Sequence, residues 1–123
     1  MTTERRACRR FSVPGAAVEW RSEPEGKTYG SDARVGDISR GGLRLLTPAP
    51  PRTGDALRLT LQVPGEPALE LWGHVAWASA SSGQIHEVGV EFAPYGDGSH
   101  LNPQKALDGL VALERRFLGD GAR

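Results

Sequence analysis

The sequence predicts a mainly β protein, a small six-stranded antiparallel β-barrel with a C-terminal α-helix. Three observations predict this fold class. Apolar and polar residues alternate through several short segments, and Gly- and Pro-rich turns separate these segments. Near residue 103 the apolar period changes from two residues to that of a helix. Short strands at close spacing are typical of a small barrel, and 123 residues are the length of one domain.

Each predicted strand is an alternating run bounded by turn residues. The clearest is 56–63, whose apolar side chains face one way and whose polar side chains face the other. The prolines of 47–55 make that segment a loop, because proline cannot serve a central strand. In the fifth strand, Gly73 suits a bulge or tight bend, and Trp77 shares the apolar face that is expected to pack into the core. The six predicted strands cover residues 11–20, 29–35, 43–46, 56–63, 69–77 and 88–92.

A helix at about 103–118 is predicted from an apolar stripe and a start signal. Asn102 is a favourable N-cap, and Pro103 suits the first helical position because its missing N–H donor is not needed there. Gly109 costs about 1 kcal/mol relative to alanine, so packing of the stripe is expected to hold the helix. The stripe consists of Ala106, Leu110, Leu113 and Phe117, widened by Leu107 and Val111.

Composition argues against several classes of protein. The formal net charge is +0, whereas nucleic-acid binding needs a net basic face for phosphate contacts. No apolar run is long enough to span a bilayer, and no hydrophobic signal region follows the N-terminus. One cysteine cannot form an internal disulfide, which fits a reducing compartment, so a cytoplasmic bacterial protein is expected. The sequence contains no nucleophile–base pair, phosphate loop or metal-ligand spacing, so we expect no enzyme, no catalytic residue, no cofactor and no metal site.

Two segments carry polar chemistry. Residues 1–9 are expected to be a flexible arm in front of a single domain at 10–120. The segment DISRGG, residues 37–42, combines an acid, a hydroxyl and two glycines directly before a strand. These groups suit a site for a polar, anionic ligand, but Asp37 and Ser39 can also simply bond their own turn. The positive charge of the N-terminal segment comes from Arg5, Arg6, Arg9 and Arg10.

Together these segments resemble the PilZ domain, the bacterial receptor module for cyclic di-GMP. The family pattern is Arg-x-x-x-Arg followed by Asp/Asn-x-Ser-x-x-Gly, and the segment 37–42 matches the second motif. Arg6 and Arg10 match the first; Arg5 and Arg9 have the same spacing, but the family's strand begins directly after the second arginine. The resemblance extends to GHVAW, VGVEF and the closing helix, and it implies a Greek-key, split β-barrel.

The resemblance also implies the ligand and its contacts. An arginine at Arg5 tends, in the family, to accompany two stacked ligand molecules rather than one. Arg44 flanks the second motif, and either a phosphate contact or surface solvation suits it. The implied cyclic di-GMP contacts are Arg5, Arg6, Arg10, Asp37, Ser39 and Gly42. Weaker candidates are Arg9, Arg40, Gly41 and Trp77.

The implied mechanism is that the arm closes over the ligand against the 37–42 turn. A guanidinium can donate two parallel bonds to guanine O6 and N7 or to a phosphate, and Asp37 can accept from guanine N–H groups. Ser39 can donate to a phosphate oxygen, and Gly42 leaves room for close backbone approach or takes a positive φ. Ordering the arm would change the surface shown to an unidentified downstream protein. The alternatives are a PilZ-fold adaptor that binds only protein and, less favoured by the neutral charge, a non-specific nucleic-acid binder.

Overall fold

The computed structural model describes residues 9–23, 29–48, 50–80, 85–99 and 101–118. Arg5 and Arg6 lie outside this range, so their predicted contacts remain predictions. Among the described residues, no helix has both the length and the apolar content needed to cross a membrane. The strands are β1 (Ala17–Glu23), β2 (Tyr29–Ile38), β3 (Gly42–Thr47), β4 (Ala56–Gln62), β5 (Leu69–Ala80) and β6 (His86–Phe92), and the helix is α2 (Gln104–Leu118).

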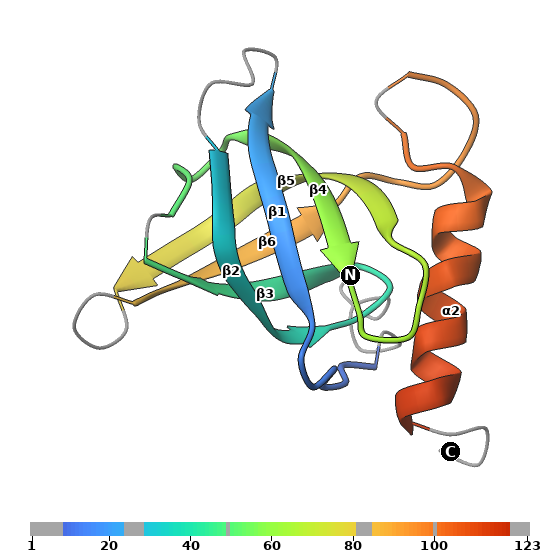
Figure 1. Cartoon of the computed structure of the whole chain (residues 1–123). Coiled ribbons are helices and arrows are strands. Elements are labelled where there is room, and N and C mark those ends of the chain that lie inside the picture. The colour runs from blue at the N-terminus through green and yellow to red at the C-terminus, as the bar shows by residue number, and fades with distance from the viewer. Residues whose placement is uncertain (1–8, 24–28, 49, 81–84, 100, 119–123) are drawn as a thin grey trace.

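The six strands form a closed antiparallel barrel in the order β1-β2-β3-β6-β5-β4, with β4 pairing back to β1. The crossover from β3 to β4 places β3 beside β6, and β4, β5 and β6 follow as a meander, which is a Greek-key arrangement. Figure 1 shows the barrel from the side, with α2 standing beside it. The predicted fold class, a six-stranded antiparallel barrel with a C-terminal helix, is confirmed.

Alternation along the strands fills the barrel interior. In β4 the residues predicted to face inward, Leu57, Leu59 and Leu61, are at most 1% exposed. Trp20 of β1 is the largest of the fully buried side chains. The residues before β1 also contribute, because Phe11 and Val13 are buried although they lie outside the six strands, and an isolated bridge joins Phe11 to Ile38. Residues 11–13, which we call the root of the N-terminal segment, are thereby fixed to the barrel.

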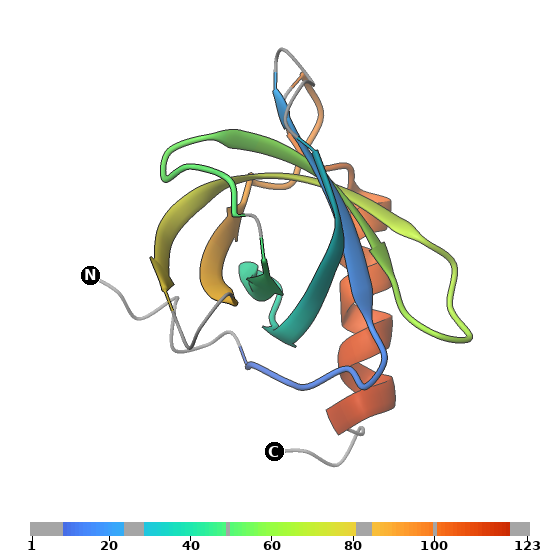
Figure 2. The same ribbon diagram turned by 60° about the vertical axis from the view of Figure 1, so that its left-hand side comes forward.

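Helix α2 packs its predicted stripe against the barrel. Ala106, Leu110 and Leu113 are buried, and a second view shows the helix running along the outside of the strands (Figure 2). Gly109 has a packing reason, since a Cβ there would lie 2.6 Å from Cδ2 of Leu69 on β5. The glycine therefore lets the helix approach the sheet closely, which offsets its low helix propensity.

Two expectations about local structure are wrong. Asn102 does not cap α2: it is buried, its Oδ1 accepts from the Trp72 N–H at 2.7 Å, and its Nδ2 donates to the carbonyls of Trp72 and Ala93. The irregularity in β5 lies between Val75 and Trp77, not at Gly73. Both differences arise from tertiary contacts that a sequence pattern does not contain.

Candidate functional site

The N-terminal segment and the 37–42 turn meet at one rim of the barrel. Phe11 and Ile38 exchange two backbone hydrogen bonds, at 2.9 and 3.0 Å, so the segment runs antiparallel to the end of β2. This pairing puts Arg10 next to Asp37, and its Nη1 donates to Asp37 Oδ1 at 2.8 Å. The arginine side chain is 61% exposed and the carboxylate 23% exposed. The structure therefore brings together one residue from each predicted motif.

A second arginine holds the other oxygen of Asp37. Arg44 is the register partner of Asp37 on β3, and its Nε donates to Asp37 Oδ2 at 3.2 Å. Its Nη1 lies 3.5 Å from Glu87 on β6. The guanidinium extends over Gly36, where a Cβ would lie 2.8 Å from Arg44 Cζ. Asp37 is thus fixed in orientation by two arginines, of which only Arg10 comes from the N-terminal segment.

The row of paired residues continues across the sheet to an exposed tryptophan. Arg44 pairs with Gly89 on β6, and Gly89 pairs with Trp77 on β5. The indole lies against Gly89, because a Cβ built there would overlap its ring. Trp77 is 44% exposed, so the predicted core position is wrong. The β-bulge between Val75 and Trp77 explains the difference, because one extra residue turns the following side chain to the outer face.

The turn at 39–42 is closed by its own backbone and by Ser39. The Ser39 N–H donates to the Gly42 carbonyl at 2.8 Å, and Ser39 Oγ accepts from the Gly41 N–H at 3.1 Å. Ser39 is 4% exposed, so its hydroxyl shapes the turn in this arrangement, and its contact with a phosphate remains a prediction. Neither Gly41 nor Gly42 has a positive φ. Gly42 instead permits close approach of β6, because a Cβ there would overlap the Val90 carbonyl oxygen.

The family model of the PilZ domain matches residues 4–111. The chain belongs to the PilZ domain family. The match includes both motifs and all six barrel strands of this PilZ chain. No curated protein matches the chain.

Solved structures show the same PilZ fold at low sequence identity. The Bacillus subtilis inhibitor of motility MotI/DgrA has a TM-score of 0.64 and 18% identity, over 93% of this chain and 52% of that chain. The K. pneumonia MrkH–c-di-GMP complex has a TM-score of 0.60 and 16% identity, over 87% of this chain and 50% of that one. The PilZ domain of YcgR from Escherichia coli, solved with c-di-GMP, has a TM-score of 0.59 and 16% identity, over 91% and 95% of the two chains. This chain spans about half the length of MotI and MrkH.

The weaker PilZ candidates have different surroundings. Arg9 is exposed at the start of the described residues. Arg40 sits in the middle of the turn, and its Nε donates to Glu114 of α2 at 2.8 Å. Gly41 is exposed, and its carbonyl accepts from the Phe92 N–H at 2.9 Å. The Arg40 guanidinium is therefore paired with a carboxylate of the helix.

An open groove of about 540 Å³ is lined by residues that lie close in sequence to Arg10 and to Asp37. One wall begins at Ser12, two residues after Arg10, and the other ends at Gly36, the residue before Asp37. Arg34 also lines the groove, and its side chain is exposed.

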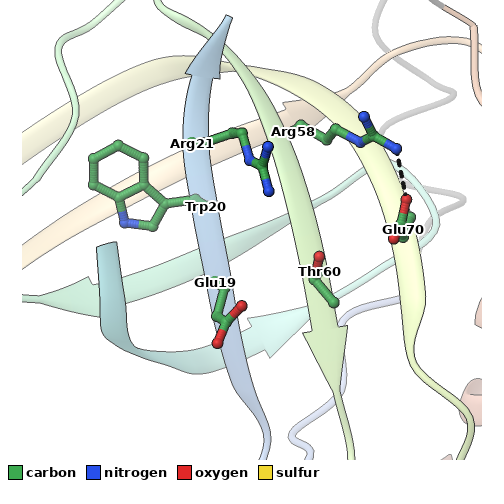
Figure 3. Close-up of a pocket in the computed structure, with 6 residues that line it drawn as sticks. All are labelled: Glu19, Trp20, Arg21, Arg58, Thr60 and Glu70. Atoms are coloured by element: carbon green, nitrogen blue, oxygen red, sulfur yellow. Dashed lines mark hydrogen bonds and ion pairs between the residues drawn. The ribbon is translucent and has the colours of Figure 1, made fainter. Parts of the chain in front are cut away.

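A second, smaller depression lies elsewhere on the outer surface, over β1, β4 and β5 (Figure 3). It measures about 130 Å³. Arg58 bonds Glu70 at 2.9 Å, and the lining includes two arginines and two glutamates, so the depression has no net charge to favour an anion. Its lining residues are Glu19, Trp20, Arg21, Arg58, Thr60 and Glu70.

Sequence reasoning missed two parts of the site. It considered Arg44 only as a flanking cation and did not pair it with Asp37, and it gave Gly89 no role. Both follow from cross-strand register, since Asp37, Arg44, Gly89 and Trp77 are successive partners across four strands. A strand assignment with the correct register could have found Arg44, but the bulge that exposes Trp77 has no sequence signal that we recognise.

Proposed function

We propose that this chain is a receptor for cyclic di-GMP that binds the nucleotide at the rim formed by its N-terminal segment and the 37–42 turn. The observation that carries the proposal is the 2.8 Å hydrogen bond between Arg10 and Asp37, which joins the two family motifs in one place. Membership of the PilZ family supports it, as do the solved structures of MrkH and the YcgR PilZ domain with c-di-GMP.

The chemistry of Arg10 and Asp37 suits this ligand. Each guanine offers acceptors, O6 and N7, on one edge and N–H donors on another, and each phosphate offers further acceptors. When Arg10 leaves Asp37 for the nucleotide, the carboxylate can accept the guanine N–H donors in its place. Arg44 continues to hold the second oxygen of Asp37, so the carboxylate keeps its orientation during the exchange. The Arg10–Asp37 pair is solvent-exposed and therefore weak, which makes it easy to replace.

The outer-face tryptophan adds a stacking surface to the proposal. Trp77 lies in the same cross-strand row as Arg44, and its indole rests on Gly89. Base–aromatic stacking contributes about 1–3 kcal/mol per base. In this proposal, a guanine bound near Asp37 and Arg44 stacks on the indole of Trp77. The groove beside Ser12 accommodates the remainder of the nucleotide.

The wider role follows from the same proposal. Arg5, Arg6 and Arg9 close over the ligand, and a stacked pair of nucleotides binds through Arg5. The chain acts as a cytoplasmic receptor rather than an enzyme, needs no cofactor, and passes its signal to another protein. The second candidate, a PilZ-fold adaptor that binds only protein, differs from this proposal in one measurable property, its indifference to nucleotide.

Calorimetric titration of the purified chain tests the proposal. Cyclic di-GMP is expected to bind with micromolar or tighter affinity, and stoichiometry above one nucleotide per chain supports the stacked pair. Cyclic di-AMP is the matched control, because adenine replaces the O6 acceptor by an N6 donor and so reverses the partner that Arg10 needs. Absence of binding heat with cyclic di-GMP contradicts the proposal and favours the adaptor. Equal affinity for the two nucleotides contradicts the assigned contacts.

A further inference from the structure

The turn of the candidate site is attached to the C-terminal part of the chain. Arg40, in the middle of the turn, donates from Nε to Glu114 Oε1 of α2 at 2.8 Å. Its backbone carbonyl accepts a 2.6 Å hydrogen bond from the hydroxyl of Tyr95, in the segment before α2. The Glu114 side chain is only 16% exposed, so this carboxylate is largely removed from water at the contact. Side chain and backbone of Arg40 are thus both held from outside the turn.

The same helix contacts the root of the N-terminal segment. Phe117 stacks on Phe11, with ring centroids 6.5 Å apart and planes inclined by 14°. Phe11 directly follows Arg10 and exchanges its backbone hydrogen bonds with Ile38, so its position fixes where Arg10 leaves the barrel. Glu114 and Phe117 are three residues apart in the helix and therefore lie on one face. One helical turn consequently touches both walls of the candidate site.

We infer that α2 is a positioning element for the nucleotide site, acting through Glu114 on the 39–42 turn and through Phe117 on the segment that carries Arg10. This inference rests on the proposed function. Docking of the helix keeps both walls in the geometry that binds nucleotide. Because binding linkage is reciprocal, the nucleotide strengthens helix docking by the same factor by which docking strengthens nucleotide binding. A partner that draws α2 from the barrel therefore weakens nucleotide binding, and the helix is the route by which the site reports its state.

The chain contains a matched control for this inference. Arg116 of α2 donates to Glu66 Oε2 at 2.7 Å and to the Pro64 carbonyl at 3.1 Å, which ties the same helix to the turn between β4 and β5. The pair resembles Arg40–Glu114 in chemistry, and Glu66 is 28% exposed. Arg116 also lies over the Phe117 ring, 4.7 Å from Cζ to the centroid, but among the described residues Glu66 itself bonds neither the 39–42 turn nor Phe11. Substituting Glu66 therefore removes a contact between the helix and the turn after β4, and it leaves the contacts of Glu114 and Phe117 with the two walls of the site in place.

The first test compares cyclic di-GMP affinity in the full chain and its variants by calorimetry. Glu114→Gln is expected to raise Kd about two- to fivefold, the range for loss of one partly exposed ion pair, and Phe117→Leu is expected to act in the same direction. Glu66→Gln is expected to leave Kd unchanged. Unchanged affinity in both Glu114→Gln and Phe117→Leu overturns the inference, as does an equal loss in Glu66→Gln. If the unsubstituted chain does not bind, the proposed function fails and this inference fails with it.

Amide hydrogen exchange measures the reciprocal effect, that of the nucleotide on helix docking. Saturating cyclic di-GMP is expected to slow amide exchange in α2 of the unsubstituted chain and of Glu66→Gln. The doubly substituted chain, Glu114→Gln with Phe117→Leu, is expected to show no such protection at nucleotide saturation. A merely structural role for the two residues predicts faster exchange with and without nucleotide, but the same ligand-induced protection. Protection that survives in the double variant therefore contradicts the inference.

Discussion

The guanidinium of Arg10 bonds the carboxylate of Asp37 at 2.8 Å, although 27 residues separate them in sequence. The fold creates this contact, because Phe11 pairs with Ile38 at the end of β2 and the side chain of Arg10 then reaches Asp37. Arg44 completes the arrangement from the neighbouring strand β3. The charges at this rim therefore satisfy one another, and in the proposed function a ligand with both donors and acceptors replaces part of this network.

Arg10→Ala is expected to weaken cyclic di-GMP binding about 10- to 100-fold, because it removes one or two charge-assisted hydrogen bonds to the nucleotide. Calorimetric titration measures the loss, and the residual binding should depend less on salt, since an exposed cation is screened. Arg58→Ala is the matched control, because Arg58 is also an exposed arginine paired with a carboxylate, Glu70 at 2.9 Å. Equal losses in the two variants would contradict a specific role for Arg10.

Trp77 is expected to report binding by its fluorescence. A guanine that stacks on the exposed indole should change its emission when cyclic di-GMP is titrated. Trp77→Phe should abolish most of the change and leave thermal stability nearly intact. Trp72→Phe serves as control, because Trp72 lies under Arg58, 5.4 Å from the ring centroid to Cζ. A ligand-induced change that persists in Trp77→Phe and disappears in Trp72→Phe would place the base elsewhere.

Gly42→Ala is expected to lower the free energy of unfolding by about 2 kcal/mol, because the added Cβ overlaps the Val90 carbonyl oxygen and β3 must move from β6. Urea denaturation measures the change. Gly54→Ala is the comparison: its φ is +93°, but no atom lies within 4 Å of the added Cβ. The Gly42 variant should also lose nucleotide affinity, whereas Gly54→Ala should not. An unchanged free energy of unfolding in Gly42→Ala would contradict this prediction, because β3 and β6 would then separate to admit the Cβ without loss of stability.

Asn102→Ala is expected to destabilise the fold by about 2–4 kcal/mol, since it strips partners from the Trp72 N–H and from the carbonyls of Trp72 and Ala93. Asn102→Asp should also destabilise, because a carboxylate oxygen would then face the two carbonyls. Gln104→Ala, at an exposed helical position, should change the free energy of unfolding little. If Asn102→Ala matches Gln104→Ala in denaturant unfolding, the amide network does not stabilise the barrel.

Much of the fold could be predicted from the sequence, because alternation records which side chains face the core. Leu57, Leu59 and Leu61 are buried as their spacing predicts. Trp77 shows where this reasoning ends, since one bulged residue changes its face without altering the apolar pattern before it. Asn102 shows the same limit for a polar residue: its sequence position suits a helix cap, but the nearest unsatisfied backbone groups belong to β5 and the segment after β6.

The candidate site divides in the same way. Arg10 and the residues of 37–42 could be named from their motifs, whereas Arg44, Gly89 and Glu114 could not be connected with them. Cross-strand partners are fixed by register, and register depends on pairings between distant segments rather than on local spacing. Sequence alone also gave Ser39 and Gly42 ligand contacts, whereas their described contacts close the turn and admit β6.

By itself, the sequence of this chain determined a small β-barrel with a helix and two polar motifs, because side-chain periodicity and turn chemistry are local properties. Only the tertiary structure decided that Arg10 meets Asp37, that Trp77 faces outward and that Glu114 holds Arg40. The physical reason is that closing the barrel selects one register among many locally equivalent ones. That choice sets which charges become neighbours.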